Sequence, residues 1–237
     1  DDDQPFGSLR HVTEPYEVDG VAPAALYRRS RASFNRARLK AAAMMILRSS
    51  SASPFARKVR IAAAVLGLTR RIEIVPADTS DPTDTLRVQN PLGKIPTLVL
   101  GDGRALYDSA VILEYLDHLA GGGKIIPTGP DRFDVLTRAA LADGVTDAAI
   151  LKVYETRWRE DGARSARWLD HQTGKIGRGL AALDAMQPDP DKVDVASIGL
   201  ACALGYLDLR FAGAWRTERP KLAVWLDAFS AHVPAFE

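Results

Sequence analysis

The stretch SPFARKV at residues 53–59 has the pattern of a helix start, and NPLGKIP at residues 90–96 has the pattern of a turn that leads into a strand. Serine before proline favours a helix start, because the hydroxyl can accept a hydrogen bond from a free backbone N–H and proline fits the first helical position. Apolar residues then recur every three or four positions as far as Leu66, and Gly67 is a typical stop signal. We therefore expect an amphipathic helix in the first stretch and a strand entrance in the second.

Working outward from these stretches, four segments have the composition and period of strands. They are residues 44–48, 71–75, 97–100 and 104–107. The last two are joined by Gly-Asp-Gly, which favours a hairpin. Further helices are expected over 81–88 and 109–119, so the predicted order is strand, helix, strand, helix, strand, strand, helix.

The second half of the chain has only helical patterns, separated by Gly, Pro and Asp clusters. The expected helices are 131–159, 163–186, 194–210 and 220–232. The first residues differ from the rest, being polar and turn-rich and then basic. The predicted organisation is an N-terminal extension of unclear role (1–43), an α+β domain (44–122), a linker (123–130) and an all-helical domain (131–237).

Composition excludes several functional classes. The 237 residues carry 31 Lys+Arg against 30 Asp+Glu, and a net charge of +1 gives no reason to expect a nucleic-acid partner. No apolar run approaches the roughly 18 residues that span a bilayer, so no membrane partner is expected. Cys202 is the only cysteine and the four histidines are scattered, so we expect no metal site. One cysteine and no visible secretory signal predict a cytoplasmic protein.

The ordered set of motifs resembles the glutathione S-transferase family. The likeness runs from about residue 44 to the C-terminus and rests on 53–59, 90–96, the pair Asp108-Ser109 and the segment 194–210. It implies a thioredoxin-like N-terminal domain (βαβ–ββα) that binds glutathione, followed by an all-α domain. It further implies a homodimer without a metal, which conjugates the glutathione thiolate to a small hydrophobic electrophile in a detoxification role.

The resemblance places Ser53 at the catalytic position. Conjugation needs a thiolate, whereas a free thiol with a pKa of about 8.5 is mostly protonated at neutral pH. A hydroxyl donor beside a helix N-terminus favours the charged form and lowers that pKa. Ser51 remains an alternative, because some related classes place the serine slightly upstream, and a purely structural cap at Ser53 is the other reading.

The segment 90–96 supplies further candidate binding residues. The resemblance implies a cis bond before Pro96, which would turn the backbone of Ile95 outward to pair with the cysteinyl part of glutathione. Lys94 is positioned to meet a ligand carboxylate, with an exposed loop lysine as the alternative. Phe55, within the first motif, completes this part of the expected binding site.

Asp108 and Ser109 open the helix at 109–119. Free N–H groups at a helix start and a serine hydroxyl can bind a carboxylate, and Asp108 adds the charge that an ammonium group needs. The resemblance therefore assigns both residues to the γ-glutamyl end of glutathione. Simple N-capping is the alternative.

Residues 194–197 stand where the family usually has Ser/Thr-x-x-Asp, a capping box. Here the two residue types are exchanged. We expect Asp194 to cap a buried helix and Ser197 to reach back less far than a carboxylate would. This role is structural.

The first long helix after the linker is where the family lines its electrophile pocket. Its polar and aromatic candidates are Asp143, Asp147, Tyr154 and Trp158. Core or surface packing is the alternative for each. Cys202, in an apolar helix, is expected to be inert.

Two other functions remain open at this stage. One is a non-catalytic protein of the same fold that binds a ligand or a regulatory partner. The other is a glutathione-dependent reductase or peroxidase, although no cysteine lies at the start of the first helix.

Overall fold

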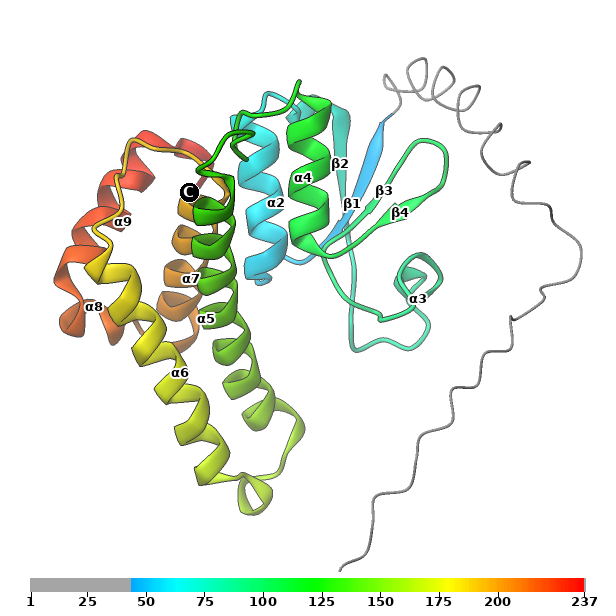
Figure 1. Ribbon diagram of the computed structural model, residues 1–237. Coiled ribbons are helices and arrows are strands. Elements are labelled where there is room, and N and C mark those ends of the chain that lie inside the picture. The colour runs from blue at the N-terminus through cyan, green and yellow to red at the C-terminus, as the bar shows by residue number, and fades with distance from the viewer. Residues whose placement is uncertain (1–43, 237) are drawn as a thin grey trace, which may run out of the picture. The chain divides into compact units, whose positions relative to one another are not determined.

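The computed structural model describes residues 44–236. The expected extension at 1–43 lies outside the described residues. The predicted βαβ–ββα unit followed by helices is confirmed (Figure 1).

Four short strands form one mixed sheet in the order β2-β1-β3-β4. The strands are β1 (Met45–Ser49), β2 (Ile72–Pro76), β3 (Thr97–Val99) and β4 (Ala105–Leu106). β1 pairs parallel with β2 and antiparallel with β3, and β3 and β4 form the hairpin. A parallel pair needs a crossover connection, and α2 (Pro54–Val65) provides it.

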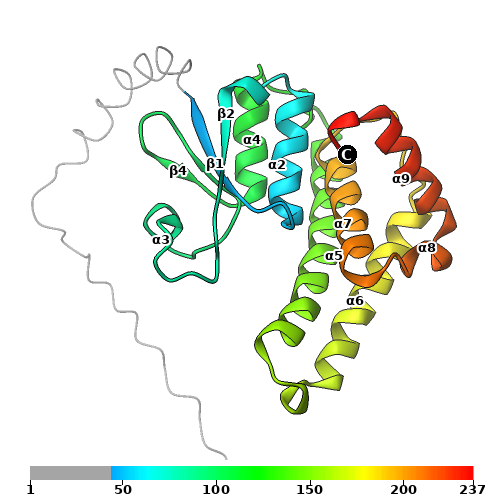
Figure 2. The ribbon, with the colours of Figure 1, turned by 180° about the vertical axis from the view of Figure 1, so that it is seen from behind.

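Two helices pack beside the sheet. They are α2 and α4 (Ser109–Leu119), which contact one another, and α2 also packs against the C-terminal helices (Figures 1 and 2). The helix predicted over 81–88 is wrong in length, because only α3 (Leu86–Gln89) forms. The carboxylates of Asp81 and Asp84 accept hydrogen bonds from the N–H groups of Thr83 and Leu86 at 2.8 and 2.7 Å. Such local turns compete with helix formation.

The C-terminal half is entirely helical. Its α-helices are α5 (Arg132–Trp158), α6 (Ala166–Ala185), α7 (Val195–Phe211), α8 (Trp215–Glu218) and α9 (Pro220–His232). Single 3₁₀ turns form at η1 (Thr69–Arg71), η2 (Asp161–Ala163) and η3 (Pro234–Phe236). α5 packs along both α6 and α7, and none of the helices in the part of the chain described here is long and apolar enough to cross a bilayer.

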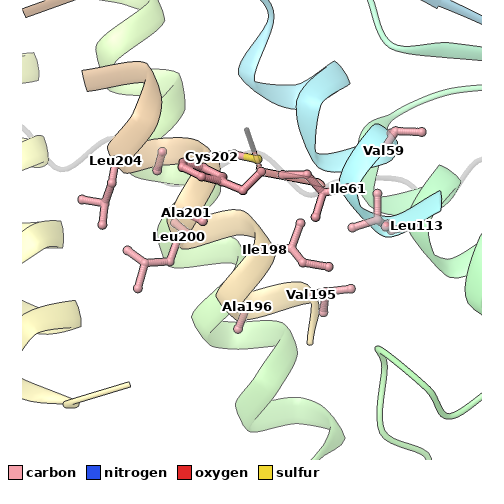
Figure 3. Packing of buried hydrophobic residues seen from close by; sticks show 14 of the residues in the cluster. Val59, Ile61, Leu113, Val195, Ala196, Ile198, Leu200, Ala201, Cys202 and Leu204 are labelled. Atoms are coloured by element: carbon pink, nitrogen blue, oxygen red, sulfur yellow. The ribbon is translucent and has the colours of Figure 1, made fainter. Parts of the chain in front are cut away.

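Helix α7 is the centre of the core. Ile198 and Leu204 are fully buried, and residues 195–204 of α7 are buried on every face, as expected for a helical segment without a polar face. Figure 3 shows Ile198 pointing toward Ile61 of α2, while Leu200 and Leu204 point to the opposite side. Cys202 belongs to this core at 1% exposure, and burial raises the pKa of its thiol to about 12.

A capping box closes the buried start of α7. One carboxylate oxygen of Asp194 accepts hydrogen bonds from the N–H groups of Ala196 and Ser197, both at 2.9 Å. The Ser197 hydroxyl in turn accepts from the Asp194 N–H at 2.9 Å. Ser197 therefore reaches back far enough to complete the capping box, although its side chain is shorter than that of an acid.

We predict that Asp194→Ala destabilises the protein by about 0.5–2 kcal/mol, because two buried N–H groups lose their acceptor. Thermal and denaturant unfolding measure the change. Asp131→Ala is the matched control, since Asp131 is the N-cap residue of α5 but its side chain makes no capping hydrogen bond. Equal losses of unfolding free energy in Asp194→Ala and Asp131→Ala would contradict the assignment of Asp194 as the stabilising cap of α7.

Candidate functional site

A cavity of about 630 Å³ lies between the N-terminal domain and helices α5 and α7. This volume falls in the range of small-molecule sites. Its N-terminal wall contains Ser53, Phe55, Lys94 and Ile95, together with the loop 77–80. Its helical wall is made by side chains of α5 and α7.

Ser53 is the N-cap residue of α2 and lines the cavity. Its Oγ accepts a hydrogen bond from the N–H of Ala56 at 3.2 Å. Among residues 44–236 no acceptor is found for the Ser53 hydroxyl proton, so the cap leaves that proton free to be donated. A group placed against this hydroxyl would also meet the positive end of α2.

The neighbouring serines differ in position. Ser51 is exposed in the turn before α2 and is not part of the cavity wall. Ser50, which no sequence motif singled out, does line the cavity. The geometry therefore brings Ser53 to the cavity and leaves Ser51 outside it.

The segment before β3 forms the opposite edge of the N-terminal wall. Ile95 lines the cavity, and the peptide bond between Ile95 and the buried Pro96 is cis. The side chains of Asn90 and Thr97 hold the turn by donating hydrogen bonds to the Lys94 carbonyl, both at 2.9 Å. The backbone N–H and C=O of Ile95 have no partner within 44–236 and can accept an extended peptide.

Asp108 and Ser109 lie outside the cavity wall. Asp108 caps α4 by accepting from the Ala110 N–H at 2.8 Å, and its side chain is exposed. Ser109 is buried and donates to Asp108 at 3.3 Å. Asp108 is nevertheless close enough to Asp147, on the helical wall, to affect the pKa of that residue.

A buried ion pair joins the two sides of the cavity. The Lys58 ammonium, on α2, donates to both carboxylate oxygens of Asp143, on α5, at 2.6 and 2.8 Å. Burial raises the pKa of Asp143, although Lys58 opposes that rise. One turn further along α5, burial and the charges of Asp143 and Asp108 raise the pKa of Asp147, and Lys94 opposes this.

The loop 77–80 is held by a buried arginine that sequence reasoning did not identify. Arg48, at the end of β1, donates to Asp84 and Gln89, both at 2.7 Å. The other oxygen of Asp84 accepts from the Asp78 N–H at 2.8 Å, and these hydrogen bonds lower the pKa of Asp84. Arg48 could have been identified in the sequence as a charged residue within an otherwise apolar strand.

The helical wall contains two of the four expected candidates. Asp147 and Tyr154 line the cavity, whereas Asp143 pairs with Lys58 and Trp158 is 64% exposed outside it. Sequence reasoning missed the other lining residues of this wall: Ile150, Leu151, Arg157, Tyr206 and Arg210. The four-residue spacing of a tyrosine and an arginine in an apolar helix could have indicated the last two.

No group of three or more metal-ligating side chains occurs within the described range 44–236. The cavity instead offers a hydroxyl, free backbone groups and charged side chains. These can hold a peptide-like ligand and stabilise a negative charge beside the start of α2.

We predict that Asp147→Asn stabilises the protein at neutral pH and that the gain disappears on acidification. Above its raised pKa the wild-type carboxylate is ionised, and burial of that charge destabilises the folded protein. Below the ordinary pKa of Asp, residue 147 is neutral in both the wild type and Asp147→Asn, so the difference in stability disappears. Unfolding free energies of the wild type and Asp147→Asn, measured from neutral pH down to below the ordinary pKa of Asp, test the sign of the stability difference. Asp170→Asn, on the exposed face of α6, should stay within about 0.5 kcal/mol of the wild type throughout. A destabilised Asp147→Asn at neutral pH would contradict the argument.

Comparison with known proteins agrees with this geometry. The family described as "Glutathione S-transferase, N-terminal domain" matches residues 52–119, and "Glutathione S-transferase, C-terminal domain" matches residues 166–228. The chain is 35% identical over 184 residues to the uncharacterized GST-like protein YibF of Escherichia coli K12, covering 75% of this chain and 90% of the relative.

Solved structures of glutathione transferase family members also resemble the chain. A glutathione transferase family member from Pseudomonas fluorescens Pf-5, crystallised with bound glutathione, is 40% identical with a TM-score of 0.75. The match covers 81% of this chain and 96% of that chain. The same description applies to a second structure, with bound S-(propanoic acid)-glutathione, at 40% identity, the same coverage and a TM-score of 0.72. With its fold, its cavity and these relatives, the chain belongs to the glutathione S-transferase family.

Proposed function

We propose that the protein is a glutathione transferase that joins the glutathione sulfur to an electrophile held against α5 and α7. The observation that carries the proposal is the Ser53 hydroxyl, which lines the cavity at the start of α2 with its proton unused. A donated hydrogen bond and the helix dipole both favour a thiolate at this point. The thiol proton leaves to solvent, and the thiolate then forms the new S–C bond while the electrophile's leaving group departs with the electrons of the bond that breaks.

Glutathione fits the N-terminal wall as an extended peptide. The free backbone groups of Ile95 would pair with its cysteinyl residue, and Phe55 and Pro96 would flank it. Lys94 would meet a carboxylate, while Asp108 and Ser109 would receive the γ-glutamyl end at the start of α4. The relative crystallised with bound glutathione supports glutathione as the ligand, and the S-(propanoic acid)-glutathione complex supports a cavity that admits a group on the sulfur.

The cysteine-based alternatives have little support in the geometry. Cys202 is buried in α7, and a neutral buried thiol cannot exchange with glutathione disulfide. A non-catalytic ligand-binding role would be indicated if glutathione bound but no electrophile were conjugated.

The assembly and location of the protein belong to the same proposal. We expect a homodimer in the cytoplasm, as the family resemblance implies, and a hydrophobic surface on the electrophile. Sedimentation analysis of the purified chain tests the dimer.

We predict that Ser53→Ala raises the pKa of bound glutathione. Loss of a hydrogen bond to a charged group, about 1.5–3 kcal/mol, corresponds to about one to two pH units. Ultraviolet absorbance of the thiolate against pH, and the pH profile of kcat/KM, both report the change. The measurements should be made at temperatures well below the melting temperature, because Ser53→Ala also loses a helix cap and is expected to be less stable.

Ser51→Ala and Ser50→Ala are the matched controls for this experiment. Both should titrate as the wild type does. A shift confined to Ser51→Ala or Ser50→Ala would move the catalytic assignment to that residue. If no serine variant shifted the profile, backbone N–H groups would hold the thiolate and Ser53 would be only a cap.

We predict that Lys94→Ala and Asp108→Ala each raise KM for glutathione while kcat changes comparatively little. Both residues are assigned to ends of glutathione that do not react. Their loss should therefore weaken the binding of the ground state and of the transition state by similar amounts. Steady-state kinetics with varied glutathione measure this, and Lys124→Ala, an exposed linker lysine, is the control. Unchanged glutathione affinity in both variants would remove this assignment.

A further inference from the structure

Two arginines of the cavity wall form no ion pair with an acidic side chain of residues 44–236. Arg48, Arg132 and Arg216 all form ion pairs at 2.7 Å. Within 44–236, no ion pair involves Arg157 or Arg210, although both line the cavity. Their charges are therefore available to something that enters it.

Tyrosine rings lie beside both guanidinium groups. The Arg157 guanidinium carbon lies 5.9 Å from the ring centroid of Tyr154, and that of Arg210 lies 5.6 Å from the ring of Tyr206. Burial raises the pKa of Tyr206, and the charges of both arginines oppose that rise. The four side chains, from α5 and α7, thus form one cluster, which we call the basic end of the cavity.

The opposite end of the helical wall is acidic. Asp147 and Arg157 lie ten residues apart on α5, which corresponds to about 15 Å along the helix axis. Ile150 and Leu151 lie between them and give the wall an apolar middle. Asp147 is the residue influenced by Lys94, Lys58 and Asp108, so its charge belongs to the end where glutathione is proposed to bind.

A cavity with this order of groups selects a particular kind of second substrate. We propose that the electrophile carries a carboxylate, which Arg157 and Arg210 bind, and an aromatic or aliphatic body that packs on Tyr154 and Leu151. Guanidinium groups suit carboxylates because they present several donors in a planar fork. The inference rests on the proposed transferase function and specifies its substrate class.

The arginines take no part in bond making. With a benzylic chloride, for example, the glutathione thiolate forms an S–C bond, the C–Cl bond breaks, and chloride leaves with the bonding electrons. The thiol proton has already gone to solvent. Arg157 and Arg210 are positioning residues that hold the far end of the electrophile.

The test compares para-(chloromethyl)benzoate with its methyl ester, which have the same reacting carbon but differ in charge. Each kcat/KM is divided by the rate constant of the spontaneous reaction with glutathione. The wild type should prefer the carboxylate, and Arg157→Gln and Arg210→Gln should each lower that preference by about tenfold or more. Arg167→Gln removes the same charge from the exposed surface of α6, outside the cavity wall, and should leave the preference unchanged.

A binding measurement separates this inference from the proposed function. Calorimetry compares S-(para-carboxybenzyl)glutathione with its methyl ester, and the carboxylated adduct should bind more tightly to the wild type but not to the two arginine variants. If the ester adduct binds and is formed equally well, the carboxylate inference is overturned and the transferase function stands. If the carboxylated adduct binds more tightly but no conjugation occurs with either chloride, the recognition stands and the transferase function fails.

Glutathione itself carries two carboxylates, so its own binding must be measured in the same variants. KM for glutathione with the ester substrate should not change in Arg157→Gln or Arg210→Gln. A raised KM for glutathione, with the carboxylate preference intact, would mean that the basic end binds glutathione, and it would overturn the inference.

Discussion

The ammonium group of Lys58 lies buried between α2 and α5, where both carboxylate oxygens of Asp143 accept its hydrogen bonds. A buried charge that loses its partner is strongly destabilising, so this pair constrains the height and rotation of α5 against α2. Asp147 and Tyr154 follow on α5 at one turn and three turns from Asp143 and lie on the cavity side. The same constraint therefore places the helical wall opposite Ser53.

Most of the fold could be predicted from local signals. Ser53 before a proline, Gly67 after the last apolar residue and the Gly-Asp-Gly turn between strands each act within a few residues, so their consequences are visible in the sequence. The error at 81–88 has the same origin. Asp81 and Asp84 bind nearby N–H groups with their side chains, and a helical pattern does not show which acceptor the backbone will choose.

The cavity could be predicted only in part, because its two walls come from segments far apart in the chain. Ser53, Lys94 and Ile95 belong to motifs with a fixed order, and the structure brings them to one wall. Arg157 and Arg210 belong to no motif, and their helices meet only through tertiary packing. A periodic pattern predicts that a helix has a buried face, but it does not predict what the remaining faces enclose.

The burial of Cys202 has a consequence for the proposed transferase function. Any reagent able to alkylate glutathione can also alkylate a cysteine thiolate of the protein that holds it. Here the chain has one cysteine, its side chain is 1% exposed, and its pKa of about 12 keeps it protonated. An electrophile that enters the cavity therefore meets no cysteine thiolate of the chain within residues 44–236, and the core of the folded protein protects Cys202 from alkylation.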